Sequence, residues 1–218
     1  MLPATNTMPK KTKKPSPKTP TSPIRDRRRR ELIEATITVI AKHGYAGTTV
    51  ARVAKEAGLS VGLMNFHFKS IDSLFDETFR FIAAEYDGVW REATARRAGE
   101  PAERRLERMI RAYFDPRVFT HRKVAVWFAF WSDANLRDRF HAPAIRVERR
   151  FSRELERTVI ALAKVRRIPA GDAKVIATSL TAMIDGLWLQ FMLTPKSAGQ
   201  HYAVKTCLGM LRRWLPDK

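Results

Sequence analysis

The chain has a single cysteine, Cys207, among its 218 residues. One cysteine excludes a disulfide within the chain and is typical of proteins of the reducing cytoplasm, where we expect this protein. No uninterrupted apolar run approaches the roughly 18 residues that cross a bilayer, and no apolar signal-peptide region stands at the N-terminus. We therefore expect neither a membrane span nor a secreted disulfide scaffold.

Enzyme signatures are also missing. The five histidines are scattered, and none stands in an H-E-x-x-H motif or beside a cysteine at zinc-ligand spacing. There is no glycine-rich phosphate loop and no G-x-S-x-G nucleophile elbow. Most acidic residues alternate with arginines, as on solvated helix faces. The sequence thus predicts no catalytic residues, no metal site and no cofactor.

Positive charge is abundant and unevenly distributed. The formal net charge is +19, and residues 1–30 hold ten of the 41 Lys and Arg residues against one acid, Asp26. Residues 1–24 also hold six of the 12 prolines and cannot bury a core, so we expect a disordered basic tail there. Such a tail is either a passive extension or an arm that follows DNA phosphates.

The rest of the chain has the apolar spacing of helices and no alternating strand pattern. Gly44 is placed to end the first helix, and Pro101, Pro116 and Pro169 bound later ones. Residues 121–133 are apolar on all sides, which predicts a helix buried on all sides. We predict an all-α protein whose longer helices cover about 25–43, 71–98, 101–116, 121–133, 143–167, 170–193 and 197–215.

Residues 48–69 predict two short helices separated by a tight turn at 58–60. Thr49 and Ser60 can cap the N-termini of these helices, and Gly58 tolerates the left-handed conformation that ends the first. Val53 and Met64 belong to a small shared core. Two helices joined in this way form a helix-turn-helix, whose second helix enters the major groove of DNA.

The residues from Gly44-Tyr45 to His67-Phe68-Lys69 resemble the DNA-binding domain of TetR-family repressors. Residues 125–131 and 182–189 resemble BetI, the choline-responsive branch of that family. The resemblance implies a DNA-binding domain at 25–70 and a ligand-binding and dimerisation domain at 71–218. Ile71 replaces a lysine and Phe66 a tyrosine, and in the family both contact phosphate, so each departure removes a backbone contact.

Nine residues of the two short helices are free to face DNA. Asn65 can pair with an adenine edge or a phosphate, and Val61 or Leu63 can contact a thymine methyl group. Gly62 permits close approach of the backbone, while the hydroxyl, imidazole and ammonium groups of the set suit phosphate. The predicted DNA-contacting residues are Thr49, Arg52, Ser60, Val61, Gly62, Leu63, Asn65, His67 and Lys69.

Aromatic residues of the C-terminal part allow two interpretations. They form an ordinary core, or they form a cage whose ring faces attract a quaternary ammonium ion, with a carboxylate nearby. The resemblance to BetI favours choline or betaine aldehyde as the inducer, and a lipophilic or aromatic inducer is the alternative. The predicted ligand-binding residues are Tyr113, Phe114, Trp127, Phe128, Trp131, Asp185 and Trp188.

The last two predicted helices carry apolar faces. These faces either pack within the monomer or, as the resemblance implies, join those of a second copy in a four-helix bundle. A palindromic operator requires such a twofold protein. We therefore predict a homodimeric repressor that a small inducer releases from double-stranded operator DNA. The alternative is a general nucleic-acid-binding protein without a specific operator.

Overall fold

The computed structural model describes residues 23–132 and 134–216, without the side chains of 134–148. Over these residues the chain forms nine α-helices and no strand, which confirms the predicted fold class. The predicted tail at 1–24 lies outside the described residues except for the first two residues of α1. The helices are α1 (Pro23–His43), α2 (Val50–Glu56), α3 (Val61–His67), α4 (Ile71–Thr94), α5 (Ala102–Tyr113), α6 (His121–Ser132), α7 (Ala134–Val165), α8 (Ala170–Leu193) and α9 (Gln200–Trp214).

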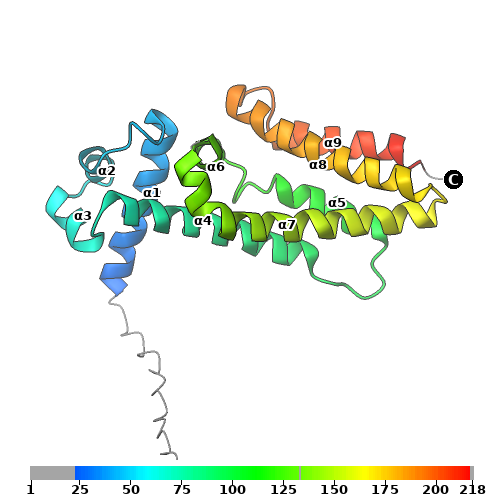
Figure 1. Ribbon diagram of the computed structural model, residues 1–218, viewed down its shortest axis with the longest axis horizontal. Coiled ribbons are helices and arrows are strands. Elements are labelled where there is room, and N and C mark those ends of the chain that lie inside the picture. Colours follow the sequence, from blue (N-terminus) through cyan, green and yellow to red (C-terminus); the bar gives the residue numbers. More distant parts are fainter. Residues whose placement is uncertain (1–22, 133, 217–218) are drawn as a thin grey trace, which may run out of the picture.

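Helices α1, α2 and α3 form a small unit at one end of the molecule (Figure 1). Helix α1 packs against α2, α3 and the start of α4, and the side chains between them are fully buried. Val53 and Met64 are both 0% exposed, as the predicted shared core requires. The unit is therefore held by the same apolar residues that the helix-turn-helix pattern indicated.

Helices α4 to α9 form the larger part of the molecule. The long helices α4 and α7 contact each other and α5, while α8 packs along α7, and α9 packs on α8 and α5 (Figure 1). One cluster of buried apolar side chains continues from Leu32 in α1 to Leu215 after α9. The small unit and the larger part consequently share a core, with α6 packed against α1.

Several predicted helix boundaries differ from the observed ones, and the largest differences are at the end of α4 and the start of α7. Helix α4 ends at Thr94 and not near 98, because Arg108 of α5 donates hydrogen bonds to the last carbonyl groups, those of Glu92, Ala93 and Ala95. A cation at a helix C-terminus satisfies carbonyl groups that no further turn pairs. Helix α7 begins at Ala134 and so includes Pro143, which removes one backbone hydrogen bond and bends a helix without ending it.

Helix α6 is less completely buried than predicted. Trp131 is 37% exposed, whereas Trp127 and Phe130 of the same helix are buried. The helix also buries a charged side chain, Lys123. Its ammonium donates hydrogen bonds to Glu85 Oε2 at 2.7 Å and to the carbonyl oxygen of Arg117 at 2.6 Å. The buried lysine therefore ties α6 to α4 and to the segment before α6.

Helix α8 is long and apolar enough to cross a membrane by length and composition, a test that core helices of soluble proteins also pass. Its inner face packs against α7, but Val175 is 65% exposed and Leu193 is 66% exposed. Tyr202 of α9 is also exposed. Helices α8 and α9 thus leave apolar side chains on the outer surface.

Candidate DNA interface and ligand site

Local side chains cap the N-termini of α2 and α3. Thr49 Oγ1 accepts a hydrogen bond from the backbone N–H of Arg52 at 3.3 Å, and Ser60 Oγ accepts one from Leu63 at 3.1 Å. Gly58 has a φ of +66°, in the left-handed region that favours glycine. Both predicted caps and the predicted turn are confirmed, so the local sequence sets the angle at which α3 leaves α2.

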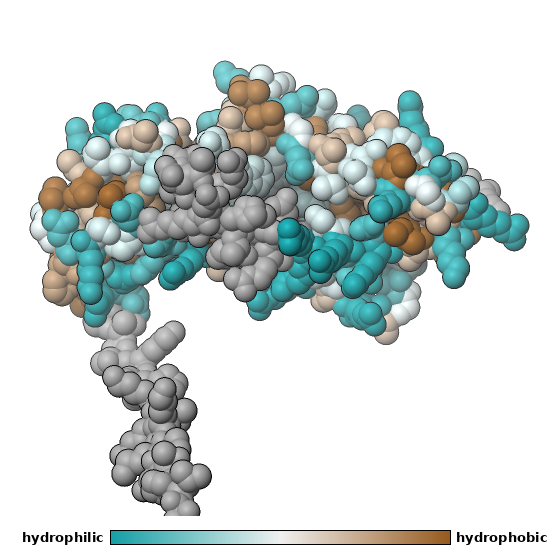
Figure 2. Space-filling view, viewed as in Figure 1, coloured by the Kyte–Doolittle hydropathy of each residue, from teal (hydrophilic) through white to brown (hydrophobic). Residues whose placement is uncertain are grey.

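The outer face of α3 is open to solvent. Asn65 and Lys69 are exposed, and a Cβ added at Gly62 would meet no atom closer than 3.9 Å. Val61 is 44% exposed and Phe66 is 72% exposed. Figure 2 shows apolar residues on the surface at this end of the molecule.

The remaining predicted DNA-contacting residues differ in their exposure. Thr49, Arg52 and Ser60 are exposed, and the guanidinium of Arg52 donates to the carbonyl oxygen of Gly47. Leu63 is half-buried. Ile71, one of the two departures from the family pattern, is half-buried against the core.

His67 corrects a prediction. Its side chain is 7% exposed, and its Nδ1 atom has no hydrogen-bond partner. Burial, and next the neighbouring cation of Arg29, hold the pKa of His67 below its ordinary value. The ring is therefore neutral at pH 7 and does not offer a positive charge to a phosphate. The sequence placed His67 correctly at the end of α3 but not on the face away from the core.

Arg29 of α1 holds the end of α3, a role that the sequence did not single out. Its Nη1 donates to the carbonyl oxygen of His67 at 2.6 Å, and its guanidinium lies 4.4 Å from the ring centroid of Phe68. Its Nη2 pairs with Glu77 of α4. One side chain thus joins α1, the C-terminus of α3 and α4. The run of arginines at 27–30 gave no sign of which member does this.

Aromatic rings of α4, α5, α6, α7 and α8 meet in a second candidate site. Tyr86 is central to it, with ring centroids 5.8 Å from Trp127, 5.9 Å from Trp188 and 5.3 Å from Phe151. Trp127 also lies 5.3 Å from Phe79. These contacts are edge-to-face, the arrangement that aromatic pairs prefer. We call the rings of Phe79, Tyr86, Trp90, Tyr113, Trp127, Phe151 and Trp188 the aromatic cluster.

The cluster includes some of the predicted ligand residues and leaves others out. Trp188 Nε1 donates to the carbonyl oxygen of Tyr113 at 3.1 Å, so both belong to it. Phe114 is fully buried against Phe119, whose ring in turn lies 5.5 Å from that of Trp188, so Phe114 contacts the cluster through Phe119. Trp131 and Phe128 contact each other at the edge of the cluster. Asp185 lies on the exposed face of α8, outside the cluster, which corrects the prediction that it accompanies the rings.

Sequence analysis missed Phe79, Tyr86, Trp90 and Phe151 as parts of this site. Each stands in the apolar stripe of a long helix, a position that core residues and ligand-binding residues occupy alike. Their common location depends on how α4 and α7 pack, which helical spacing does not specify.

The cluster holds unpaired donors, and the carboxylates beside it in the described part of the chain are paired with cations. Trp127 Nε1 and Trp90 Nε1 are buried without a hydrogen-bond partner, a costly state for an N–H group. The carboxylates nearby are already paired: Glu85 with Lys123, Asp87 with Arg150, and Asp115 with Arg117. Over the described residues no group of three His, Cys, Asp or Glu side chains could hold a metal ion.

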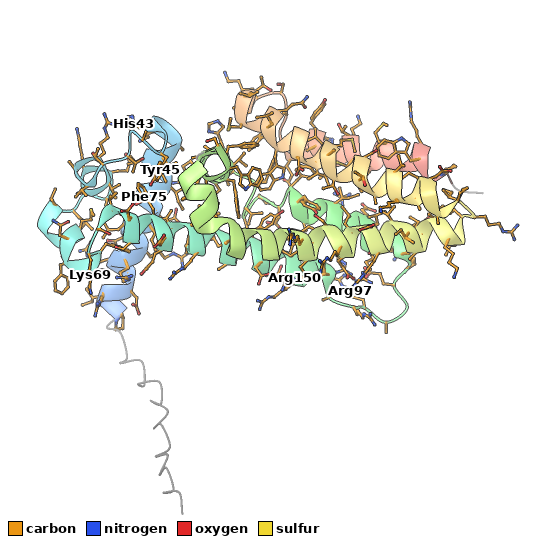
Figure 3. All side chains as sticks on the ribbon, in the orientation of Figure 1. His43, Tyr45, Lys69, Phe75, Arg97 and Arg150 are labelled. Atoms are coloured by element: carbon orange, nitrogen blue, oxygen red, sulfur yellow. The ribbon has the colours of Figure 1, made fainter. Side chains whose placement is uncertain are left out.

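Side chains of α6 and α4 connect the cluster to the small N-terminal unit. Arg122 of α6 donates to Thr38 Oγ1 of α1 at 2.7 Å, and its guanidinium lies 3.8 Å from Glu34. The Tyr45 ring lies 4.6 Å from Phe75 and 6.4 Å from Phe130. Figure 3 shows Tyr45 and Phe75 at this junction, with Lys69 farther out on the N-terminal unit. A shift of α6 or α4 would therefore be transmitted to α1.

Comparison with known proteins gives consistent matches over both parts of the chain. Residues 32–78 match the family described as bacterial regulatory proteins, tetR family. Residues 101–216 match the family described as BetI-type transcriptional repressor, C-terminal. The HTH-type transcriptional regulator BetI of Paraburkholderia phymatum is 32% identical over 173 residues, which are 78% of this chain and 84% of that protein.

Two solved structures are similar to this chain over most of its length. A transcriptional regulator of Pseudomonas aeruginosa PAO1 is 28% identical, with a TM-score of 0.66 over 86% of this chain and 90% of that one. A regulator of Saccharomonospora viridis, solved in complex with choline, is 21% identical, with a TM-score of 0.63 over 86% of this chain and 96% of that one.

Proposed function

The chain belongs to the TetR family of transcriptional regulators, with a BetI-type C-terminal domain, and on this premise we propose how it works. It binds a palindromic operator as a homodimer through the exposed face of α3. It releases the operator when a quaternary ammonium compound, choline or betaine aldehyde, binds in the aromatic cluster. The observation that carries the inducer assignment is the meeting of the Tyr86, Trp127 and Trp188 rings.

The operator contacts come from α3 and its flanks. Asn65 is the exposed side chain best suited to read a base edge, and Val61 is suited to a thymine methyl group. Lys69, Arg52 and the backbone near Gly62 approach phosphates. Phe66 adds an exposed ring, which stacks on sugar or base edges but carries no hydroxyl for a phosphate.

The inducer binds through ring faces and through an unpaired donor. Ring quadrupoles attract a quaternary ammonium ion by about 0.5–2 kcal/mol per contact. Trp127 Nε1 would donate to the oxygen that choline and betaine aldehyde both carry, which satisfies the buried N–H. The fold is shared with a regulator solved in complex with choline, which supports a choline-sized ligand for this chain.

The response is a shift between two populated states. Helices α4 and α6 contribute rings to the cluster, and both also contact α1. Helix α4 does so through the ion pair of Glu77 with Arg29, and α6 does so through Arg122. A ligand that separates the rings moves these helices, and the two copies of α3 then no longer match successive major grooves. The dimer forms through the exposed apolar side chains of α8 and α9, including Val175, Leu193 and Tyr202.

A lipophilic or aromatic inducer is the second candidate. It is favoured by the pairing of the described carboxylates around the cluster, because Glu85, Asp87 and Asp115 each already form an ion pair with a cation. Titration of operator release separates the two candidates. Choline and its neutral analogue, with carbon in place of nitrogen, should differ strongly if ring faces recognise the charge. Equal release by both would favour the lipophilic inducer.

General nucleic-acid binding is tested by competition with bulk DNA. A regulator with a specific operator keeps its preference for one palindrome by a factor of about 10³ or more, whereas a general binder does not. Loss of all preference under a tenfold excess of bulk DNA would overturn the operator proposal.

A further inference from the structure

A groove follows α5, with α4 beside its first part and α9 beside the rest, and none of its lining residues belongs to the proposed DNA interface or to the aromatic cluster. Three neighbouring cavities of about 280, 360 and 190 Å³ lie along it. The first and second share Arg111 and Gln200 in their linings, and the second and third share Leu208 and Arg212. The shared residues make the cavities one continuous groove.

The middle cavity is cationic. Among the described residues that line it there is no acidic side chain; they are Arg111, Gln200, His201, Val204, Lys205, Leu208 and Arg212. Arg111 is paired with Glu107 at 2.6 Å. Lys205 and Arg212 are exposed and have no ion-pair partner within the described part of the chain. These two unpaired cations lie about two turns apart on the same face of α9, where they attract a carboxylate or a phosphate.

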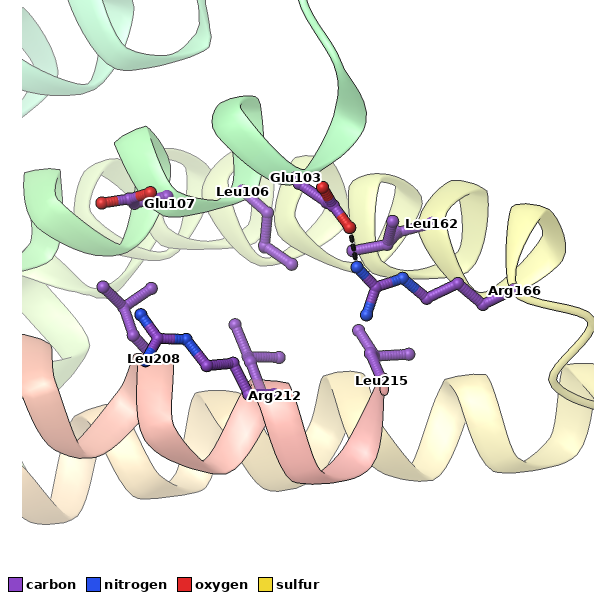
Figure 4. A pocket seen from close by; sticks show the side chains of 9 residues that line it. Glu103, Leu106, Glu107, Leu162, Arg166, Leu208, Arg212 and Leu215 are labelled. Carbon is purple, nitrogen blue, oxygen red and sulfur yellow. Dashed lines mark ion pairs between the residues drawn. The ribbon is translucent and has the colours of Figure 1, made fainter. Parts of the chain in front are cut away.

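The cavity that adjoins it has an apolar floor. Leu106, Leu162, Leu211 and Leu215 line it and are almost fully buried in the remainder of the fold. Figure 4 shows leucines of α5, α7 and α9 facing one another, with Arg212 beside them. Three charged residues besides Arg212 also line this cavity and are paired, Glu103 with Arg166 and Glu107 with Arg111. A chain entering from the cationic cavity would therefore meet leucine side chains.

We propose that the groove binds a small anionic amphiphile. Its carboxylate or phosphate monoester lies at Lys205 and Arg212, and its alkyl chain lies over the leucines. This site takes a ligand of opposite charge to the proposed inducer and shares no residue with the aromatic cluster. It is therefore a second ligand site, independent of the proposed function.

Isothermal titration calorimetry on the full chain tests the site. Octanoate and octyl phosphate should bind, whereas octyltrimethylammonium should not, and inorganic phosphate should bind at least tenfold more weakly. Arg212→Gln should weaken octyl phosphate binding about tenfold, because a charge-assisted hydrogen bond is lost. Arg104→Gln is the matched control, since Arg104 is exposed on α5 and lines none of the three cavities. It should leave the affinity unchanged.

A second variant tests the apolar half of the groove. Leu208→Asn should weaken octyl phosphate binding and leave inorganic phosphate binding as it is, with circular dichroism confirming the fold. The proposal is overturned if neither octyl anion binds at millimolar concentration, or if Arg104→Gln and Arg212→Gln weaken binding equally. It is also overturned if inorganic phosphate binds as tightly as octyl phosphate, or if bulk DNA displaces the amphiphile. Choline response and operator affinity of Arg212→Gln should match the wild type, so failure of either proposal can be told from failure of the other.

Discussion

Arg29→Lys should weaken operator binding although it keeps the charge. The guanidinium of Arg29 contacts the carbonyl oxygen of His67, Glu77 and the Phe68 ring at once, and a lysine ammonium cannot hold all three. A hydrogen bond from a charged group contributes about 1.5–3 kcal/mol, the partly exposed ion pair at most about 1 kcal/mol, and the ring contact about 0.5–1 kcal/mol. Since lysine retains some of these contacts, we expect a loss of about 1.5–2 kcal/mol.

The loss should appear as a smaller fraction of molecules with α3 correctly placed. Apparent affinity falls in proportion to that fraction, so operator affinity measured by fluorescence anisotropy should drop by as much as about 10- to 30-fold. Arg28→Lys is the matched control, because Arg28 pairs only with Glu31 on the same helix. Equal affinities of Arg29→Lys and the wild type would refute the reasoning, as would a loss that is accompanied by a changed salt dependence, since the charge is kept.

Three further predictions concern other parts of the molecule. Asn65→Ala should change the preference among operator variants. Lys69→Ala should weaken binding to all of them and make the slope of log binding constant against log salt concentration shallower by about one. Equal effects of both substitutions in a binding screen would contradict these roles. The fold keeps His67 neutral and the unfolded chain protonates it near pH 6.5, so the free energy of unfolding should fall as pH drops through about 6.5, and His67→Gln should flatten that dependence in denaturant titrations. Leu193→Asp should shift the chain toward monomer in sedimentation velocity, and an unchanged dimer would place the interface elsewhere.

The local features of the DNA-binding unit could be predicted because neighbouring residues determine them. The caps at Thr49 and Ser60 and the left-handed Gly58 involve contacts within three residues, and all three are confirmed. The burial of His67 could not be predicted, since the end of α3 packs against residues far away in the chain, such as Arg29, which is 38 residues away. Distance along the sequence, and not residue type, separates what was predicted from what was missed.

The same holds for the larger part of the molecule. Its helical content followed from apolar spacing, but the end of α4 depends on Arg108 of the next helix. Tyr86 lies at the centre of the aromatic cluster because α4 packs against α7, and the sequence offered it only as one of several apolar positions. Asp185 was expected near the rings, yet it is exposed on α8 while Trp188, one turn further along the same helix, is buried, a difference that depends on how α8 packs against its neighbours.

The most direct test of the proposed function is choline titrated into the operator complex, with operator release and tryptophan fluorescence recorded together. The wild type should release the operator with quenching of tryptophan fluorescence, and the neutral carbon analogue should need a much higher concentration. Trp127→Leu keeps apolar bulk and removes the ring and the unpaired Nε1, so it should bind operator normally and respond weakly to choline. Failure of choline and betaine aldehyde to release the operator at millimolar concentration, or an unchanged choline response in Trp127→Leu, would contradict the proposal.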